Sequence, residues 1–291
     1  MTKNEFSRLM EKGILFLDGA TGSNLIEAGM PRGLCTEKWI CENPDILLTL
    51  QKAYVEAGSD ILYAPTFAAN RLTLESHGLE NETEQINKTL AALSIKAADG
   101  KALVAGDITT TGKFLAPQGD LSYDKLLGIY AEQITYLADS GVDLLVAETM
   151  IGIDETLAAL DAAASICSLP IMCTLTVESD GSLFTGGSIF EAAAILTEMG
   201  ADAIGINCSS GPDQLECIIR NLSAITDLPV IAKPNAGLPQ ILPDGSAHYN
   251  MQADEFADSM KCLKDAGAKI LGGCCGTTPE YIRKMKELIK A

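Results

Sequence analysis

The stretch Ala268-Lys269-Ile270-Leu271-Gly272-Gly273-Cys274-Cys275-Gly276-Thr277-Thr278-Pro279-Glu280 joins a predicted strand to a predicted helix. Its first four residues are short and apolar enough to form a buried strand. Thr278 is a favourable helix N-cap, Pro279 suits the first helical position, and Glu280 lies in the electropositive first turn. The glycines allow close approach of backbone and ligand. The stretch therefore predicts a strand-to-helix turn that carries two adjacent cysteines.

The same pattern of a short apolar run followed by helical periodicity repeats along the whole chain. The apolar runs end at polar or glycine-rich turns and cover residues 13–18, 60–64, 102–105, 143–147, 170–176, 201–206, 229–233 and 268–271. Helical periodicity is expected over 3–12, 44–57, 82–98, 123–139, 153–165, 189–199, 212–224 and 252–266, and again after residue 278. Residues 31–43 show no regular pattern and are expected to be irregular.

Eight apolar runs that each precede a helix predict an α/β fold, a (β/α)₈ TIM barrel. Continuous rather than alternating apolar residues are what strands of a parallel sheet need when both faces are covered. No linker or change of composition divides the chain, so residues 1–291 are expected to form a single domain.

Charge and composition exclude several classes of function. The formal net charge of −18, from 21 basic and 39 acidic residues, argues against nucleic acid as a partner. No apolar run approaches the roughly 20 residues of a membrane helix, and the first residues lack the features of a secretory signal. Nine cysteines are an odd and dilute set for a disulfide scaffold. We therefore expect a reducing, cytoplasmic setting and no membrane partner.

A barrel collects the carboxyl ends of all its strands on one face, where enzymes of this fold carry their sites. Polar side chains mark these ends in the sequence. They are Asp18, Thr66, Asp107, Glu148, Cys208, Asn235, Cys274 and Cys275.

The cysteines at the strand ends allow three interpretations. A disulfide between Cys274 and Cys275 would close a small, strained ring. Two buried, inert thiols are also common in protein cores. The third interpretation adds Cys208, which ends the sixth apolar run, two strands away around the barrel. Three thiolates in this arrangement match a catalytic Zn²⁺ site with one open coordination position.

Zinc bound by three thiolates has a net charge near −1 and is a weak Lewis acid. Such a site suits coordination of a substrate thiol, which removes the thiol proton and leaves the sulfur nucleophilic. A free thiol is only a few per cent ionised at neutral pH, so the gain in reactivity is real. The expected reaction is transfer of an electrophilic group, most plausibly methyl, to a thiol.

Other polar residues at the barrel mouth suit an amino-acid substrate. Asp18 and Glu148 are placed to bind an ammonium group, although Asp18 also has a structural alternative, bonding to the amides of its own turn. A carboxylate such as Glu148 at the end of an apolar strand is costly to bury unpaired, which favours a functional role. Thr21, Gly22 and Ser23 offer backbone N–H groups or a hydroxyl to a substrate carboxylate.

With these residues in hand, the chain resembles the homocysteine S-methyltransferase family, and most of all the homocysteine-binding domain of cobalamin-dependent methionine synthase. The resemblance covers essentially the whole chain. It is carried by the segments 18–22, 147–149, 205–208, 234–239 and 272–279.

The resemblance implies a barrel that binds zinc through Cys208, Cys274 and Cys275, with the homocysteine sulfur as fourth ligand. It also implies that Asp18 and Glu148 hold the amino group and that Asn235 lies near the vacant zinc position. The product would be methionine. The chain has no Asp-x-His-x-x-Gly cobalamin signature, so methylcobalamin would be bound on a separate corrinoid protein or cobalamin domain.

Three alternatives stay open at this point. The same zinc barrel could use an S-methylmethionine-type donor with homocysteine. It could act on a different substrate as a methyltransferase or demethylase of a corrinoid system. A zinc site closed by a fourth protein ligand would instead be structural, and the barrel a binding subunit.

Overall fold

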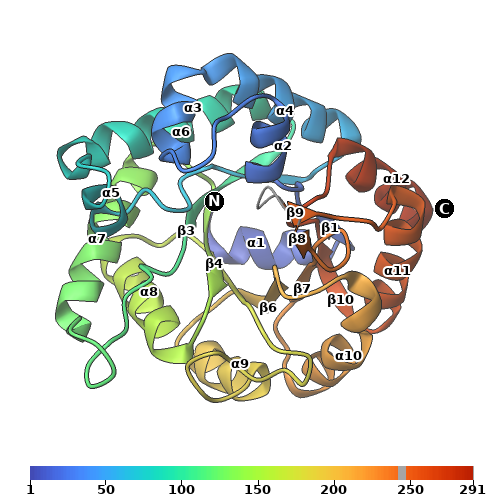
Figure 1. Ribbon diagram of the computed structural model, residues 1–291. Coiled ribbons are helices and arrows are strands. Elements are labelled where there is room, and N and C mark those ends of the chain that lie inside the picture. The colour runs from blue at the N-terminus through green and yellow to red at the C-terminus, as the bar shows by residue number, and fades with distance from the viewer. Residues whose placement is uncertain (242–246, 291) are drawn as a thin grey trace.

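The computed structural model describes residues 1–241 and 247–290, and Figure 1 shows the chain closing into a barrel of parallel strands surrounded by helices. The sheet has the order β1-β10-β7-β6-β5-β4-β3-β2. Its strands are β1 (Leu15–Phe16), β2 (Ile61–Tyr63), β3 (Leu103–Ile108), β4 (Leu144–Met150), β5 (Ile171–Leu175), β6 (Ala203–Asn207), β7 (Val230–Lys233) and β10 (Ala268–Leu271).

The barrel closes between its first two strands. Leu17 and Ile61 form a parallel bridge, in which the Asp18 N–H donates to the Ile61 carbonyl at 3.1 Å. The Asp60 N–H donates to the Phe16 carbonyl at 2.6 Å on the same seam. The predicted (β/α)₈ barrel is confirmed.

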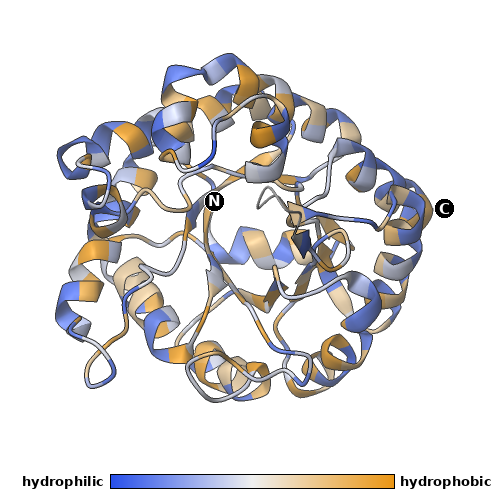
Figure 2. Ribbon diagram, in the orientation of Figure 1, coloured by the Kyte–Doolittle hydropathy of each residue, from blue (hydrophilic) through white to orange (hydrophobic). Residues whose placement is uncertain are grey.

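The helices form an outer ring with their apolar faces toward the strands, as the hydropathy colouring of Figure 2 shows. They are α1 (Lys3–Met10), α2 (Gly22–Glu27), α3 (Thr36–Glu42), α4 (Pro44–Ala57), α5 (Arg71–Glu75), α6 (Thr83–Ala98), α7 (Tyr123–Asp139), α8 (Ile153–Ile166), α9 (Ile189–Glu198), α10 (Glu216–Ile225), α11 (Ala253–Asp265) and α12 (Pro279–Lys290), with short 3₁₀ turns at Glu80–Glu82 and Pro212–Gln214. None of the helices in the described ranges is long and apolar enough to cross a membrane.

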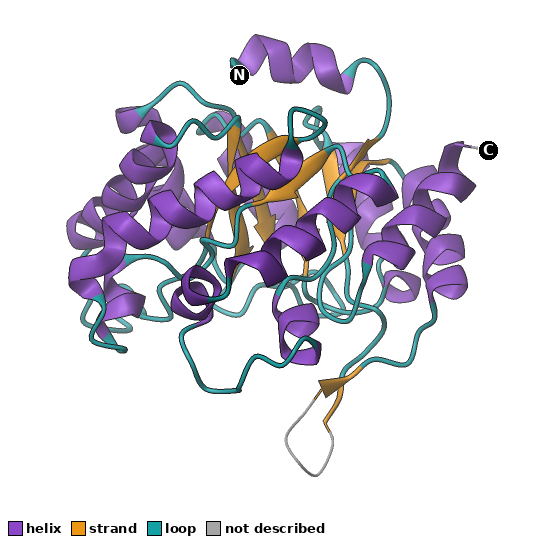
Figure 3. Cartoon of the chain, turned by 90° about the horizontal axis from the view of Figure 1, so that it is seen from above, coloured by secondary structure: helices purple, strands orange, loops and turns teal. Residues whose placement is uncertain are grey.

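The apolar core has two shells. Alternate strand residues such as Leu17, Ile61 and Ile270 fill the barrel interior, and a larger cluster packs between strands and helices. α1 lies across one end of the barrel, where Phe6 is buried among the interior residues (Figure 3). The chain thus fills the amino-terminal end and leaves the carboxyl ends of the strands to form a site.

The expectation that residues 31–43 are irregular is wrong, because Thr36–Glu42 form α3. One turn of this helix is anchored by tertiary contacts that a local pattern does not display. Ile40 is fully buried, and the Glu37 carboxylate accepts a hydrogen bond from the Ala68 N–H at 3.0 Å. The short helices α2 and α5 and the hairpin of β8 (Gln240–Ile241) and β9 (Ala247–His248) were not predicted either.

Candidate metal and substrate site

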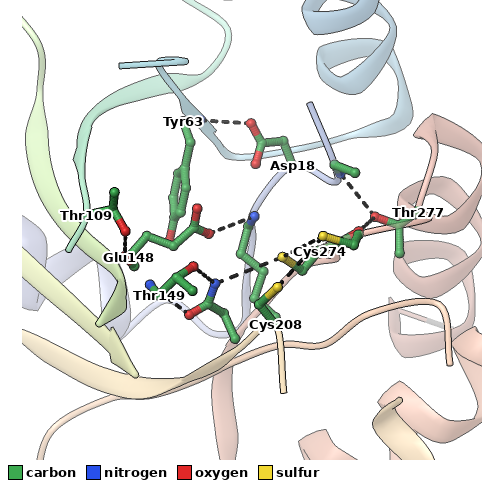
Figure 4. Close-up of polar contacts among 12 residues, drawn as sticks. Asp18, Tyr63, Thr109, Glu148, Thr149, Cys208, Cys274 and Thr277 are labelled. Atoms are coloured by element: carbon green, nitrogen blue, oxygen red, sulfur yellow. Dashed lines mark hydrogen bonds and ion pairs between the residues drawn. The ribbon is translucent and has the colours of Figure 1, made fainter. Parts of the chain in front are cut away.

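Three cysteines from two strand ends meet at the carboxyl-terminal face of the barrel (Figure 4). The Cys208 and Cys275 sulfurs are 3.7 Å apart, and those of Cys274 and Cys275 are 4.0 Å apart. All three sulfurs lie within 4.8 Å of one another. Tetrahedral zinc with Zn–S bonds of about 2.3 Å places its sulfurs about 3.8 Å apart. The donor set and its spacing therefore fit zinc held by three thiolates.

Cys208 reaches the other two cysteines because the chain turns sharply after β6. Its φ of 53° lies in the left-handed region, which non-glycine residues rarely adopt. Thr149, at φ 56°, has the same conformation after Glu148. The Asn207 side chain joins these two positions, since its Nδ2 donates to Thr149 Oγ1 at 2.7 Å and its Oδ1 accepts from the Thr149 N–H at 3.0 Å. Asn207 thus fixes two strained backbone positions, one after β6 and one within β4, that adjoin site residues.

Thr277 links the cysteine turn to the Asp18 turn. Its hydroxyl donates to the Cys274 carbonyl at 2.7 Å and accepts from the Ala20 N–H at 3.1 Å. A Cβ at Gly19 would lie 2.7 Å from the same hydroxyl, so only glycine allows this approach. The two turns therefore pack as one unit.

Protons are shared unequally among the three sulfurs. Hydrogen bonds from Cys208 and Cys274 lower the pKa of Cys275 to about 3. The hydrogen bonds of Cys208 with Cys274 and Cys275 raise the pKa of Cys208. A hydrogen bond with Cys208 lowers the pKa of Cys274, but Cys275 and burial together outweigh it and raise this pKa to about 11. Metal binding to the three sulfurs must displace the protons that these thiols carry.

A cavity of about 470 Å³ opens beside the sulfurs and has an acidic wall. Asp18, Asp107 and Glu148 line it and are each more than nine-tenths buried. Lys233 also lines it, 3.0 Å from Glu148 Oε1 and 4.8 Å from the centre of the Tyr63 ring. Burial raises the pKa of Asp18 to about 7 and raises that of Glu148, although Lys233 opposes both shifts. The pocket is therefore built for charged groups, with one cation already in place.

The structure brings most of the predicted site residues to this cavity. Thr21, Gly22 and Ser23 line it together with Asp18, Glu148 and the three cysteines. Asn235 is buried next to the cysteine turn, where the neighbouring Ala236 N–H donates to the Cys275 carbonyl at 2.9 Å. Its Oδ1 accepts no hydrogen bond within the described part of the chain.

Sequence reasoning missed Lys233 and Asn207 and gave Asp107 no role. Lys233 follows three buried apolar residues of β7. A lysine at the end of a buried strand needs a buried partner, so this pattern could have indicated a role for Lys233 in the site. Asn207 lay next to a predicted ligand, but its partner Thr149 is on another strand. Cys35 and Glu37 of the misjudged segment also line the outer cavity wall.

Comparison with known proteins agrees with this arrangement. The profile of the family described as Homocysteine S-methyltransferase matches residues 15–289. A methionine synthase of Mycobacterium leprae is 31% identical over 286 residues, which cover 92% of this chain and 24% of that protein. A methionine synthase of Mycobacterium tuberculosis is 30% identical, covering 95% and 25% respectively. The chain thus spans about a quarter of the length of these relatives.

Solved structures agree on the fold. The metallated form of the homocysteine methyltransferase MmuM from Escherichia coli superposes with a TM-score of 0.81 at 23% identity, covering 97% of this chain and 98% of that one. The family match spans nearly the whole barrel, including every predicted site residue. The chain belongs to the homocysteine S-methyltransferase family of methyltransferase enzymes.

Proposed function

We propose that this protein transfers a methyl group to the thiol of homocysteine, giving methionine, and that it uses zinc held by Cys208, Cys274 and Cys275. The observation that carries the proposal is the trio of sulfurs at zinc spacing beside a cavity with buried carboxylates. Family membership supports methyl transfer to homocysteine. When bound, zinc held by three thiolates favours a substrate thiol in its ionised, nucleophilic form.

The residues of the chain bind and orient the amino-acid part of the substrate. Asp18 and Glu148 accept hydrogen bonds from the ammonium group, and the Thr21–Ser23 turn binds the carboxylate. Asn235, buried beside the cysteine turn, would lie close to zinc held by the three cysteines. Fixing the thiol at one place in the cavity removes much of the entropic cost of meeting the methyl donor.

The donor we propose is methylcobalamin bound to a separate corrinoid protein or domain. The chain covers about a quarter of two methionine synthases, which leaves room in such proteins for further modules. The strand ends and cavity lie on one open face, where a donor held by another module has access to the sulfur. We further propose a reducing, cytoplasmic location, since the free sulfurs must stay reduced to bind metal.

X-ray absorption at the zinc edge tests the proposal. Zinc-loaded protein should show three sulfur neighbours, and added homocysteine should raise the number to four by replacing a light atom. Calorimetry in buffers of different ionisation enthalpy should detect proton release on homocysteine binding. Cys208→Ser is the matched variant and should show neither change. An unchanged sulfur count would rule out thiol ligation.

A panel of methyl donors then decides between the donor alternatives. Methylcobalamin and S-methylmethionine are supplied separately to zinc-loaded protein with homocysteine, and methionine is quantified. Methionine formed only from S-methylmethionine would replace the corrinoid donor. Failure of homocysteine with both donors would favour another substrate of a corrinoid system.

A further inference from the structure

Three buried carboxylates point into one cavity, but the proposed function uses only two. Asp107 is the third, at 4% exposure, on β3, which pairs with β4, the strand that carries Glu148. Its backbone is fixed by Thr66, whose hydroxyl donates to the Asp107 carbonyl at 2.7 Å and accepts from its N–H at 3.1 Å. The backbone of Asp107 is thus fixed at the cavity wall.

Within the described residues, Asp18 Oδ1 and Asp107 Oδ1 are buried and accept no hydrogen bond from a neutral or cationic donor. The other Asp18 oxygen accepts from the Tyr63 N–H at 2.8 Å, so the free oxygen is the one left for a ligand. Buried acceptors without donors are costly, and two of them in the wall of one cavity indicate a missing donor group.

The charges of the pocket leave room for one more cation. Three buried carboxyl groups, those of Asp18, Asp107 and Glu148, line the cavity with one lysine, Lys233, which pairs with Glu148 at 3.0 Å. Burial raises the pKa of each of the three carboxyl groups, and a bound ammonium favours their charged forms.

We propose that Asp107 is a third ammonium-binding residue, which with Asp18 and Glu148 forms a three-acceptor site selective for a primary ammonium group. A primary ammonium has three N–H donors, one for each carboxyl group. Lys233 holds Glu148 in place within this site. The assignment rests on the proposed function, since it places the amino group of the thiol substrate.

Ligand variation on the unmodified zinc-loaded protein tests the assignment. Calorimetry compares L-homocysteine, N-methyl-L-homocysteine and 4-sulfanylbutanoate, which lacks the amino group. Loss of one hydrogen bond to a charged group should weaken N-methylhomocysteine about tenfold or more, and 4-sulfanylbutanoate should bind more weakly still. A site with two acceptors leaves one N–H free and accepts the N-methyl group. Equal affinity for homocysteine and N-methylhomocysteine overturns the proposal.

Variants of Asp107 test the same point from the protein side. Asp107→Ala should lose about tenfold in affinity for homocysteine while keeping its affinity for 4-sulfanylbutanoate. Asp107→Asn retains a carbonyl acceptor and should restore most of the selectivity. Asp143→Ala is the matched control, because Asp143 accepts from the Val104 N–H at 2.9 Å outside the cavity. If Asp107→Ala keeps the wild-type ratio of affinities for homocysteine and 4-sulfanylbutanoate, the proposal is overturned. If that variant does not fold, the comparison of ligands on the unmodified protein decides alone.

Failure of this assignment is distinct from failure of the proposed function. Binding of 4-sulfanylbutanoate as tightly as homocysteine removes the ammonium site but keeps thiol ligation at zinc. Binding of neither thiol to the wild-type protein overturns the proposed function and this assignment together.

Discussion

Replacing Lys233 by methionine is the sharpest test of the electrostatic reasoning, because it removes the only cation that the described structure places against the acidic wall of the cavity. Lys233 Nζ lies 3.0 Å from Glu148 Oε1, and the two side chains are 4% and 9% exposed. Unit charges at this distance attract by about 5–6 kcal/mol at an effective permittivity of 20. Methionine carries no charge, so the free-energy cost of burying the lysine ammonium disappears. Glu148, however, is left buried without a cation. Breaking a buried pair in this way costs about 3–5 kcal/mol.

The assay is urea denaturation of the metal-free protein, followed by circular dichroism. Lys233→Met should lower the free energy of unfolding by about 3–5 kcal/mol, and adding Glu148→Gln should restore most of it, because a buried pair removed as a whole costs little. Lys286→Met is the control, since Lys286 pairs with Asp60 at 3.3 Å with side chains 20% and 33% exposed. That variant should lose about 1 kcal/mol. Equal losses in the two lysine variants would refute the reasoning.

Three further predictions concern the site. Cys208→Ser should bind zinc at least about a hundredfold more weakly in chelator competition, since losing a metal ligand costs more than losing a residue that hydrogen bonds to a ligand. Cys217→Ser, which changes an exposed cysteine, should bind zinc as the wild-type protein does. Equal zinc affinities of the two variants would disprove the ligand assignment. The preference for homocysteine over 4-sulfanylbutanoate should rise as pH increases through about 7. Burial raises the pKa of Asp18 to about 7, and below that pH the protonated carboxyl group pairs poorly with the substrate ammonium. A preference that does not change with pH would contradict the role of Asp18. Asn207→Ala removes both hydrogen bonds to Thr149 and should lower the free energy of unfolding, measured by thermal denaturation, by about 2–3 kcal/mol. Asn221→Ala, at an exposed asparagine, should change it little. Similar melting temperatures of the two variants would show that Asn207 does not fix the backbone at Thr149 and Cys208.

Local sequence determined the barrel and its main chemical groups. Eight apolar runs before eight helical segments leave few alternatives to a parallel barrel, because continuous apolar strands must be covered on both faces. The same pattern places each strand-end residue on one face, so Cys208, Cys274 and Cys275 could be grouped despite 65 intervening residues between the first and second. Glycine and proline signals also located the start of α12 at Pro279.

Only the tertiary structure decided which strand-end side chains share the cavity and with which partners. The roles of Lys233, Asn207 and Asp107 depend on side chains of other strands that lie at least 41 residues away in sequence, and no local pattern encodes such contacts. The helix α3 forms where local periodicity is weak because Ile40 and Glu37 are buried against other segments. Hydrophobic periodicity fixes which face of an element is buried, whereas pairing of charges depends on distances that exist only once the barrel has closed.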